Sequence, residues 1–351
     1  MNVTDEIVAE AADLIDYDSY VLEPDGSRLP QSSALTSILG ILRLLELEPD
    51  MCVLEVGAGS GYTGALLGRI VGEQGTVISL DVVPSLVARA AHKHSEHGVR
   101  NVAVHATDGF GGWDAGGTYD RIVGWTAPHV LPRSWVGQAR EQAVIVTPVK
   151  VAPIAGANMI LRVDVHEGRP LARDVHLGGY IEMHSEVITA FPVPVRYVDG
   201  LLRLDNHTVW VSAPELRGNP ELANRAVRVI AAGRSAASPF PSDRRVAVGA
   251  CRNHLLASRP EGLASAGVGS DWGIGLVLSD SAAFLRPDDI LVAGGHHAED
   301  RLRTLMAEWQ QAGRPDHTSL RPHLTAELDG FRVQLRGEPS VGGGGRGRVG
   351  G

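Results

Sequence analysis

The chain has 351 residues, and its 32 Lys plus Arg against 41 Asp plus Glu give a formal net charge of -9. An acidic chain does not attract phosphate backbones as a whole, so we expect no nucleic-acid partner. No run of residues approaches the roughly 20 apolar residues that a membrane-spanning helix requires. The acidic N-terminal stretch also differs from a signal peptide, so we expect a cytoplasmic protein without a membrane partner.

A glycine-rich turn stands between a predicted strand and a predicted helix in VLEVGAGSGY, residues 53–62. Gly57, Gly59 and Gly61 allow the backbone to turn sharply and to approach a ligand closely. A second predicted strand, VISLD, ends at Asp81, where a carboxylate would bind the hydroxyl pair of a ribose. This pattern predicts a site for a nucleoside cofactor.

The spacing of the glycines distinguishes between nucleoside cofactors. A dinucleotide motif places its third glycine where this chain has Tyr62, and a bulky ring there argues against NAD or FAD. Glycines at alternate positions after the acidic Glu55 instead resemble motif I of class I S-adenosylmethionine (SAM) methyltransferases.

Two further apolar runs end in loops that would reach the same site. Asp108 and Gly109 follow a predicted strand at 102–106, and that carboxylate could accept from an adenine amino group. The next strand lies within TYDRIVGWTAP, residues 118–128. The alternation of strands and helices predicts an α/β fold with a mainly parallel sheet covered on both faces. Ligands of such sheets bind outside the carboxyl ends of the strands.

The motifs VLEVGAGSGYTGALLGRIVG, TDGFGGW, YDRIV and VIVTPV occur in the order seen in protein-L-isoaspartate O-methyltransferases, and the chain resembles that family over roughly 17–180. The resemblance implies a Rossmann-like sheet that ends in an antiparallel strand, with late strands at 144–151 and 158–165. It implies SAM as cofactor and S-adenosyl-L-homocysteine as product. The residues expected to bind SAM are Glu55, Gly57, Ala58, Gly59, Ser60, Gly61, Tyr62, Asp81, Val82, Asp108 and Gly109.

The loop before motif I departs from the family. The family usually has Ile-Ser-Gln-Pro or Ile-Ser-Ala-Pro there, whereas this chain reads RLPQSSALTSIL and places Pro30 at the serine position. We expect Gln31, Ser32 and Ser33 to position the substrate. Alternatively, these residues cap a helix that begins near Ala34, because serine is a preferred N-cap. Both interpretations can hold together.

The chemistry that the resemblance implies needs no general base. A carboxyl group with a reference pKa of about 4 is already ionised at neutral pH. The enzyme must mainly hold this carboxylate in line with the methyl group of the sulfonium and exclude water. A methylated aspartyl side chain can then lose methanol and close to an aspartimide.

The chain is longer than one methyltransferase core requires. We expect a catalytic domain at 1–180, an α/β or α+β accessory domain at 181–336 and a disordered glycine-rich tail at 337–351. In the second domain, strands are expected at 207–213, 244–250 and 272–280, and helices at 220–233 and 298–313. A hairpin is expected at Asp329-Gly330.

Metal binding and disulfide bonding are not expected. The two histidine groups, at 92–97 and 296–297, lack the spacing of a convincing ligand set. Cys52 and Cys251 lie far apart and fit a reduced compartment.

Three functions remain open. The closing stretch LTAELDGFRVQLRG, residues 324–337, resembles the enlarged homologues of this family that modify an aspartate in a ribosomally synthesised peptide and yield aspartimide or isoaspartate. Pro30 and the added domain agree with that subgroup. The first alternative is conventional repair of isoaspartyl damage in proteins. The second alternative is a SAM-binding partner of a biosynthetic complex that has lost transfer activity. The expected partner is a peptide or protein carrying aspartate or isoaspartate, and the oligomeric state stays open.

Overall fold

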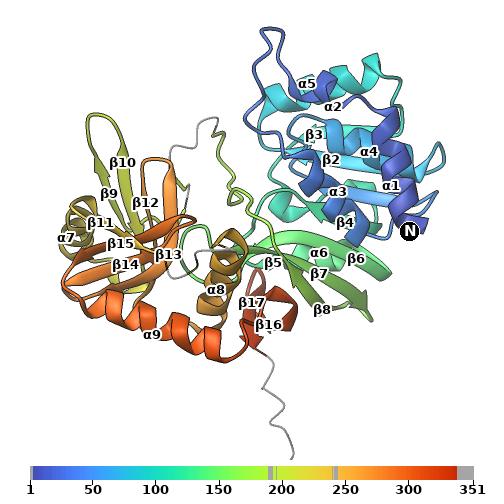
Figure 1. Ribbon diagram of the computed structural model, residues 1–351. Helices are drawn as coiled ribbons and strands as arrows, with labels where there is room; N and C mark the ends of the chain where they lie inside the picture. Colours follow the sequence, from blue (N-terminus) through green and yellow to red (C-terminus); the bar gives the residue numbers. More distant parts are fainter. Residues whose placement is uncertain (1–2, 189–192, 195, 239, 241–243, 338–351) are drawn as a thin grey trace, which may run out of the picture.

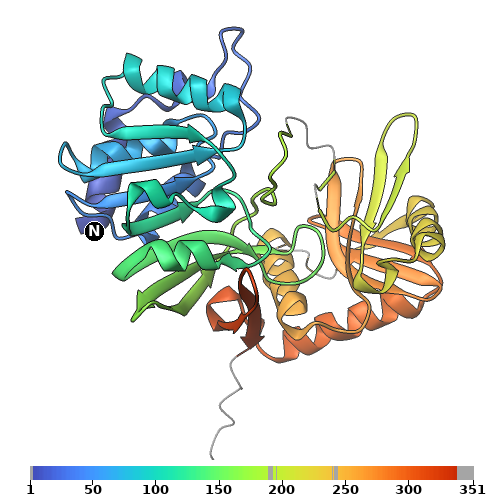
Figure 2. The ribbon, with the colours of Figure 1, turned by 180° about the vertical axis from the view of Figure 1, so that it is seen from behind.

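The computed structural model describes residues 3–188, 193–194, 196–238, 240 and 244–337. Two lobes lie side by side, the first built from the N-terminal half of the chain and the second from residues after about 200 (Figures 1 and 2). The tail predicted from Gly337 onward lies outside the described residues except for Gly337 itself. Within the described part of the chain, no helix combines the length and apolarity needed to cross a membrane.

The first lobe is built on a seven-stranded sheet with the order β3-β2-β1-β4-β6-β7-β8. Strands β3, β2, β1, β4 and β6 are parallel, and β7 pairs antiparallel with both β6 and β8. This arrangement confirms the predicted Rossmann-like sheet with late antiparallel strands. The strands are β1 Cys52–Val56, β2 Thr76–Asp81, β3 Val102–Ala106, β4 Tyr119–Gly124, β6 Ala139–Lys150, β7 Asn158–His166 and β8 Arg169–His176.

Alternation of buried side chains along β1 explains why both faces of this sheet are covered. Val53 packs into one apolar cluster with α1, α3 and α4, while Leu54 packs into a second cluster on the opposite face. Strand β2 has the same alternation, because Val77 is paired with Val53 and Ile78 is paired with Leu54. The helices of this lobe are α1 Val3–Leu14, α2 Tyr17–Val21, α3 Leu35–Leu44, α4 Tyr62–Val71, α5 Pro84–Glu96 and α6 Arg133–Gln138.

The second lobe is an antiparallel sheet with the order β11-β15-β14-β13-β12-β10-β9. Its strands are β9 Gly200–Arg203, β10 Thr208–Ser212, β11 Arg234–Ala237, β12 Leu263–Val268, β13 Asp271–Leu278, β14 Ser281–Leu285 and β15 Asp289–Gly294. Helices α7 Pro220–Ala231, α8 Arg244–Ser258 and α9 His297–Gln311 accompany it. The added C-terminal sheet agrees with the predicted fold class.

One predicted strand is wrong. The stretch 244–250 forms the start of α8 and not a strand. Its apolar residues recur with the period of a helix, since Ala247, Val248, Cys251 and Leu255 are all buried. Burial of that stripe against the core outweighs the local preference of valine for strands.

The C-terminal hairpin returns to the first lobe. Strands β16 Leu320–Ala326 and β17 Gly330–Gly337 form the expected hairpin around Asp329, and β17 also pairs with β5, Leu131–Pro132. The dark red hairpin therefore lies beside the green strands of the first lobe (Figure 1). One apolar cluster runs from Leu54 of β1 to Trp309 of α9, so the lobes share a core. The division into domains at residue 180 remains a proposal.

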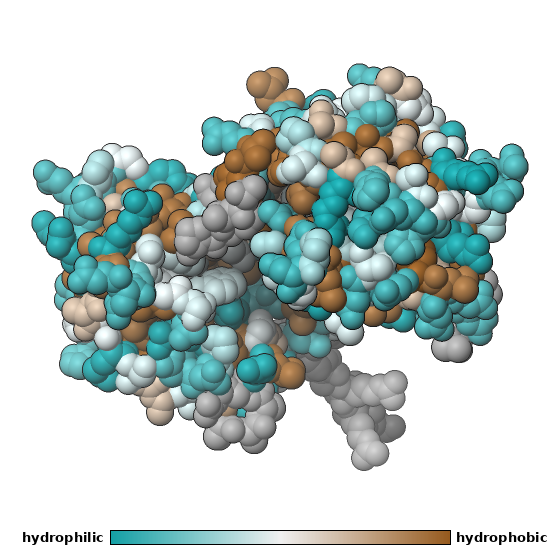
Figure 3. Space-filling view, turned by 90° about the horizontal axis from the view of Figure 1, so that it is seen from above, coloured by the Kyte–Doolittle hydropathy of each residue, from teal (hydrophilic) through white to brown (hydrophobic). Residues whose placement is uncertain are grey.

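The surface is mixed in character. Figure 3 shows hydrophobic residues scattered among hydrophilic ones and a hollow between the lobes. Single exposed apolar residues such as Leu14 and Val246 are ordinary on a protein surface. Among the described residues, no group of three or more His, Cys, Asp or Glu side chains is arranged to hold a metal ion, and both cysteines are free thiols.

Candidate active site

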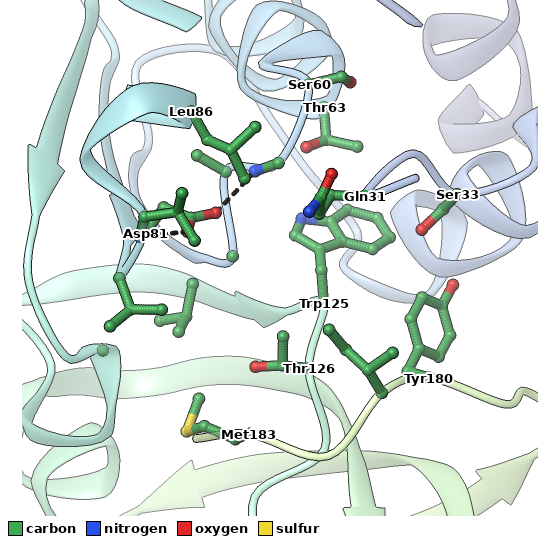
Figure 4. Close-up of a pocket in the computed structure, with 18 of the residues that line it drawn as sticks. Gln31, Ser33, Ser60, Thr63, Asp81, Leu86, Trp125, Thr126, Tyr180 and Met183 are labelled. Atoms are coloured by element: carbon green, nitrogen blue, oxygen red, sulfur yellow. Dashed lines mark hydrogen bonds between the residues drawn. The ribbon is translucent and has the colours of Figure 1, made fainter. Parts of the chain in front are cut away.

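A cavity of about 380 Å³ opens at the carboxyl ends of β1, β2 and β4. Most of the predicted site residues line it (Figure 4). They come from the loop before α3, the glycine turn after β1 and the ends of β2 and β3. The predicted residues in the lining are Gln31, Ser32, Ser33, Gly57, Ala58, Gly59, Ser60, Asp81, Val82, Asp108 and Gly109.

The glycine turn is held by the carboxylate at the end of β2. Gly59 N donates to Asp81 Oδ2 at 2.9 Å, and Val83 N donates to Asp81 Oδ1 at 2.9 Å. Gly57 and Gly59 have φ values of 98° and 52°, a region that favours glycine. A Cβ atom on Gly59 would also lie 2.7 Å from the carbonyl oxygen of Gln31. The turn therefore requires glycine for both conformation and space.

Asp108 and Gly109 shape a second edge of the cavity. Asp108 is exposed, and its Oδ1 accepts from Phe110 N at 3.0 Å. A Cβ atom on Gly109 would lie 2.3 Å from Val56 Cγ1, so this loop crosses directly over the end of β1. The carboxylates of Asp81, at the end of β2, and of Asp108, after β3, thus border the same cavity.

Glu55 does not line the cavity, contrary to the prediction of a direct SAM contact. Its side chain is fully buried beneath the glycine turn, where it accepts from Thr63 Oγ1, from Ser79 Oγ at 2.5 Å and from Trp125 Nε1 at 2.9 Å. Burial raises the pKa of Glu55 to about 7, although the three hydrogen bonds favour the charged form. Glu55 therefore supports the site from below.

Gly61 and Tyr62 are also absent from the lining. Gly61 is the N-cap of α4, and its carbonyl oxygen lies 2.9 Å from Nε2 of the buried His94. Tyr62 is fully buried, with its ring packed edge-on against Tyr17 at 4.9 Å and Tyr20 at 5.8 Å between centroids. The first turn of α4 faces the core here, so both residues have structural roles.

The loop before α3 faces the cavity and does not cap that helix. The N-cap of α3 is Ala34, which makes no side-chain capping bond, so the capping interpretation is wrong. Ser32 Oγ donates to Leu29 O at 2.6 Å, and the carbonyl of Ser33 accepts from Tyr17 OH at 2.6 Å. Gln31 and Trp125 both line the cavity (Figure 4).

Several lining residues were not predicted, and Trp125, Thr126, Tyr180 and Met183 are the most prominent. Trp125 and Thr126 follow β4 directly, so their position at a strand end was a usable signal. Tyr180 and Met183 lie in the segment after β8, where no motif marks them. The buried hydroxyl of Tyr180 has no hydrogen-bond partner among the described residues, and burial raises its pKa to about 12.

The charge of the cavity is one-sided. Its lining contains the carboxylates of Asp81 and Asp108 and, within the described part of the chain, neither lysine nor arginine. Such a cavity favours a cationic ligand group.

The model of the protein-L-isoaspartate(D-aspartate) O-methyltransferase family matches residues 11–181. A protein-L-isoaspartate O-methyltransferase of Klebsiella pneumoniae is 30% identical over 158 residues, which cover 42% of this chain and 74% of that protein. The chain belongs to this family. The predicted resemblance is thus confirmed for the first lobe.

Other members of the family match over different lengths. The enzyme of the same name from Rhizobium meliloti is 36% identical over 112 residues, which cover 32% of this chain and only 53% of that relative. A solved protein-L-isoaspartate O-methyltransferase structure has a TM-score of 0.50 and 16% identity, and the alignment covers 96% of each chain. That likeness shows the fold and extends through the second lobe.

Proposed function

We propose that this chain is a SAM-dependent O-methyltransferase that esterifies a carboxylate of an aspartyl or isoaspartyl residue in a peptide or protein. The observation that carries the proposal is the cavity itself. Its glycine turn and the carboxylates of Asp81 and Asp108 border one side, and the loop containing Gln31 to Ser33 borders another. Cofactor and substrate groups would therefore meet in one cavity.

The residues present fit SAM. Each oxygen of Asp81 accepts one backbone N–H, which leaves a lone pair on each for the hydroxyls of a ribose. Asp108 would accept from the adenine amino group. The positively charged sulfonium matches a cavity without lysine or arginine among its described lining residues. The volume of about 380 Å³ falls within the range of ligand sites.

When bound, SAM supplies an activated methyl group. Transfer of this methyl group to a carboxylate oxygen would break its carbon–sulfur bond and release S-adenosyl-L-homocysteine. Because the substrate carboxylate is already ionised near neutral pH, the chain need not remove a proton. Its task is to orient the carboxylate and to exclude water.

Uncharged polar groups of the cavity lining would hold the substrate. Ser33 is a hydrogen-bond donor in the lining that could orient a carboxylate without neutralising it by a full charge. A neutral donor suits this reaction, because a nearby cation would weaken the nucleophile and repel the sulfonium.

Tailoring of a ribosomally made peptide is a second candidate. The observation that favours it is the substrate loop, where Pro30 replaces the serine usual in the family and itself lines the cavity. The added domain no longer distinguishes the two candidates, since a solved protein-L-isoaspartate O-methyltransferase has a similar fold over 96% of this chain.

The deciding experiment is mass spectrometry after incubation of the protein and SAM with two substrates. One is a generic linear isoaspartyl peptide, and the other is a modified, ribosomally made precursor peptide that carries a normal aspartate. A methyl ester on the first peptide only supports repair. Methylation of a normal aspartate in the second, followed by loss of methanol, supports tailoring. Binding of SAM without methylation of either peptide would refute both and favour a catalytically silent partner.

A further inference from the structure

A buried ion pair joins the end of β6 to the segment after β8. Lys150 Nζ donates to Glu182 Oε1, and both side chains are only 5% exposed. Lys150 Nζ also donates to Ile154 O at 3.0 Å, while Glu182 Oε2 accepts from Arg196 N at 3.1 Å. The pair therefore connects three separate stretches of backbone.

The same pair lies directly behind the cavity wall. Ile181 and Met183, the neighbours of Glu182, both line the cavity. They are fastened to the loop after β4, because Ala127 N donates to Ile181 O at 2.8 Å and Met183 N donates to Ala127 O at 2.8 Å. We call residues 179–184 the wall segment. Successive side chains of this segment point in opposite directions, so Glu182 points away from the cavity while Ile181 and Met183 point toward it.

The antiparallel sheet of the second lobe, which we call the accessory sheet, hydrogen-bonds to the loop whose Ile154 carbonyl accepts from Lys150. Ala155 N donates to Ser212 Oγ at 2.9 Å, and Ser265 Oγ donates to Ala155 O at 2.8 Å. Both serines are fully buried, and they lie opposite each other on β10 and β12. A continuous set of hydrogen bonds therefore runs from the accessory sheet through Ala155 and Lys150 to the wall segment.

Burial of two charges is a poor way to gain stability. Removing both ions from water carries a desolvation cost that often cancels their attraction, and well-packed apolar residues can replace such pairs without loss. However, the hydrogen bonds that Lys150 and Glu182 make to backbone groups are directional, so they hold those backbone segments in one geometry. A spatial chain of contacts is not by itself a demonstration of coupling, so the pair must be tested by variants.

We propose that Lys150 and Glu182 are positioning residues that hold the wall segment against the substrate side of the cavity, and that the accessory domain sets this geometry through Ser212 and Ser265. The inference rests on the proposed function and assigns the accessory domain a part in it. The domain then acts on catalysis by holding the wall, whether or not it also contacts the peptide.

The test compares Glu182→Gln, the double variant K150M/E182Q and the double variant S212A/S265A with the wild-type chain. K150M/E182Q leaves no single buried charge unpaired, so it keeps the experiment informative if E182Q fails to fold. Asp289→Asn is the matched control, because it breaks an ion pair with Arg286 that is confined to the accessory sheet. Three quantities are measured. They are the Kd of S-adenosyl-L-homocysteine by calorimetry, kcat and KM for the peptide substrate that the wild-type chain methylates, and amide hydrogen exchange.

We expect the three test variants to lose about tenfold or more in kcat/KM for the peptide, because small displacements of positioning groups reduce rates strongly. Affinity for S-adenosyl-L-homocysteine should change by less than about threefold, since the glycine turn and Asp81 are untouched. Exchange of the Ala127 and Met183 amides should accelerate about tenfold as the wall opens locally. The Asp289→Asn control should match the wild type in all three readouts.

Two results would overturn the proposal. If amide exchange and peptide kinetics were unchanged in the Glu182 variants, the ion pair of Lys150 and Glu182 would not hold the wall segment. If kcat/KM for the peptide and the affinity for S-adenosyl-L-homocysteine fell by the same factor, the variants would be generally destabilised and the specific role in the wall would be refuted. If the wild-type chain methylates no peptide, the proposed function fails, but amide exchange at Ala127 and Met183 still decides whether the pair holds the wall.

Discussion

Trp125 donates its indole N–H to the buried carboxylate of Glu55 at 2.9 Å, and this bond joins the cavity wall to the support beneath the glycine turn. Trp125 lines the cavity, whereas Glu55 does not. Protonation of Glu55 is therefore expected to influence the wall of the site as well as the stability of the first lobe.

The stability of the protein should depend on pH through Glu55. Burial raises the pKa of this residue in the folded state from 4.5 to about 7. Its contribution to stability is therefore fully present below pH 4.5 and is lost as the pH rises through 7. Between pH 5 and pH 8 the free energy of unfolding should fall by about 2 to 3 kcal/mol from this group. Glu55→Gln removes the titration but keeps a hydrogen-bonding side chain.

Urea unfolding at pH 5 and pH 8 measures the effect. The difference in stability between Glu55→Gln and wild type should shift in favour of the variant by about 2 to 3 kcal/mol at the higher pH. Parallel pH profiles for the two proteins would show that Glu55 does not titrate in this range.

The glycine turn should not tolerate a side chain at position 59. Gly59→Ala places a Cβ atom 2.7 Å from Gln31 O and forces alanine to a φ of 52°. We expect a loss of about 1 to 3 kcal/mol in stability and a SAM affinity too weak to measure by calorimetry. Gly111→Ala is the control, since its added Cβ would meet nothing within 4 Å. Equal stability and equal SAM affinity of the two variants would show that the turn does not require glycine at position 59.

Asp81 should be necessary for cofactor binding. Asp81→Asn retains an acceptor for one backbone N–H but loses the charge and the paired acceptors for a ribose. Hydrogen bonds to charged groups are worth about 1.5 to 3 kcal/mol each, so the Kd of S-adenosyl-L-homocysteine should rise at least about tenfold. Calorimetry checks this, with Asp174→Asn on β8 as a surface control. An unchanged Kd in D81N would refute the assignment of the cofactor site.

Tyr180→Phe should not weaken the protein. The tyrosine hydroxyl is buried without a partner among the described residues, so its removal should leave the melting temperature unchanged or slightly raised. Because this hydroxyl is covered, kcat/KM for the peptide should change by less than about threefold. Thermal melting and steady-state kinetics test the two parts. A lower melting temperature would show that the hydroxyl makes a hydrogen bond in the folded protein.

The cofactor side of the site could be predicted from sequence because each of its parts is local. Gly57, Gly59, Asp81 and Asp108 each lie at or shortly after the end of a predicted strand, and the carboxyl ends of parallel strands meet at one edge of the sheet. The misplaced Tyr62 shows the limit of this reasoning. A motif gives the path of the backbone, but the direction of a side chain depends on what packs around it.

Local sequence thus determined the sheet, the glycine turn and the cofactor side of the cavity, because period and turn chemistry act over a few neighbouring residues. Only the tertiary structure decided the proposed substrate side, where Tyr180 and Met183 reach the cavity from a segment without a motif. The same holds for the pairing of β17 with β5 and for the ion pair of Lys150 with Glu182. These contacts join residues far apart in the chain, and such contacts form only when packing of the whole core compensates the entropy of bringing them together.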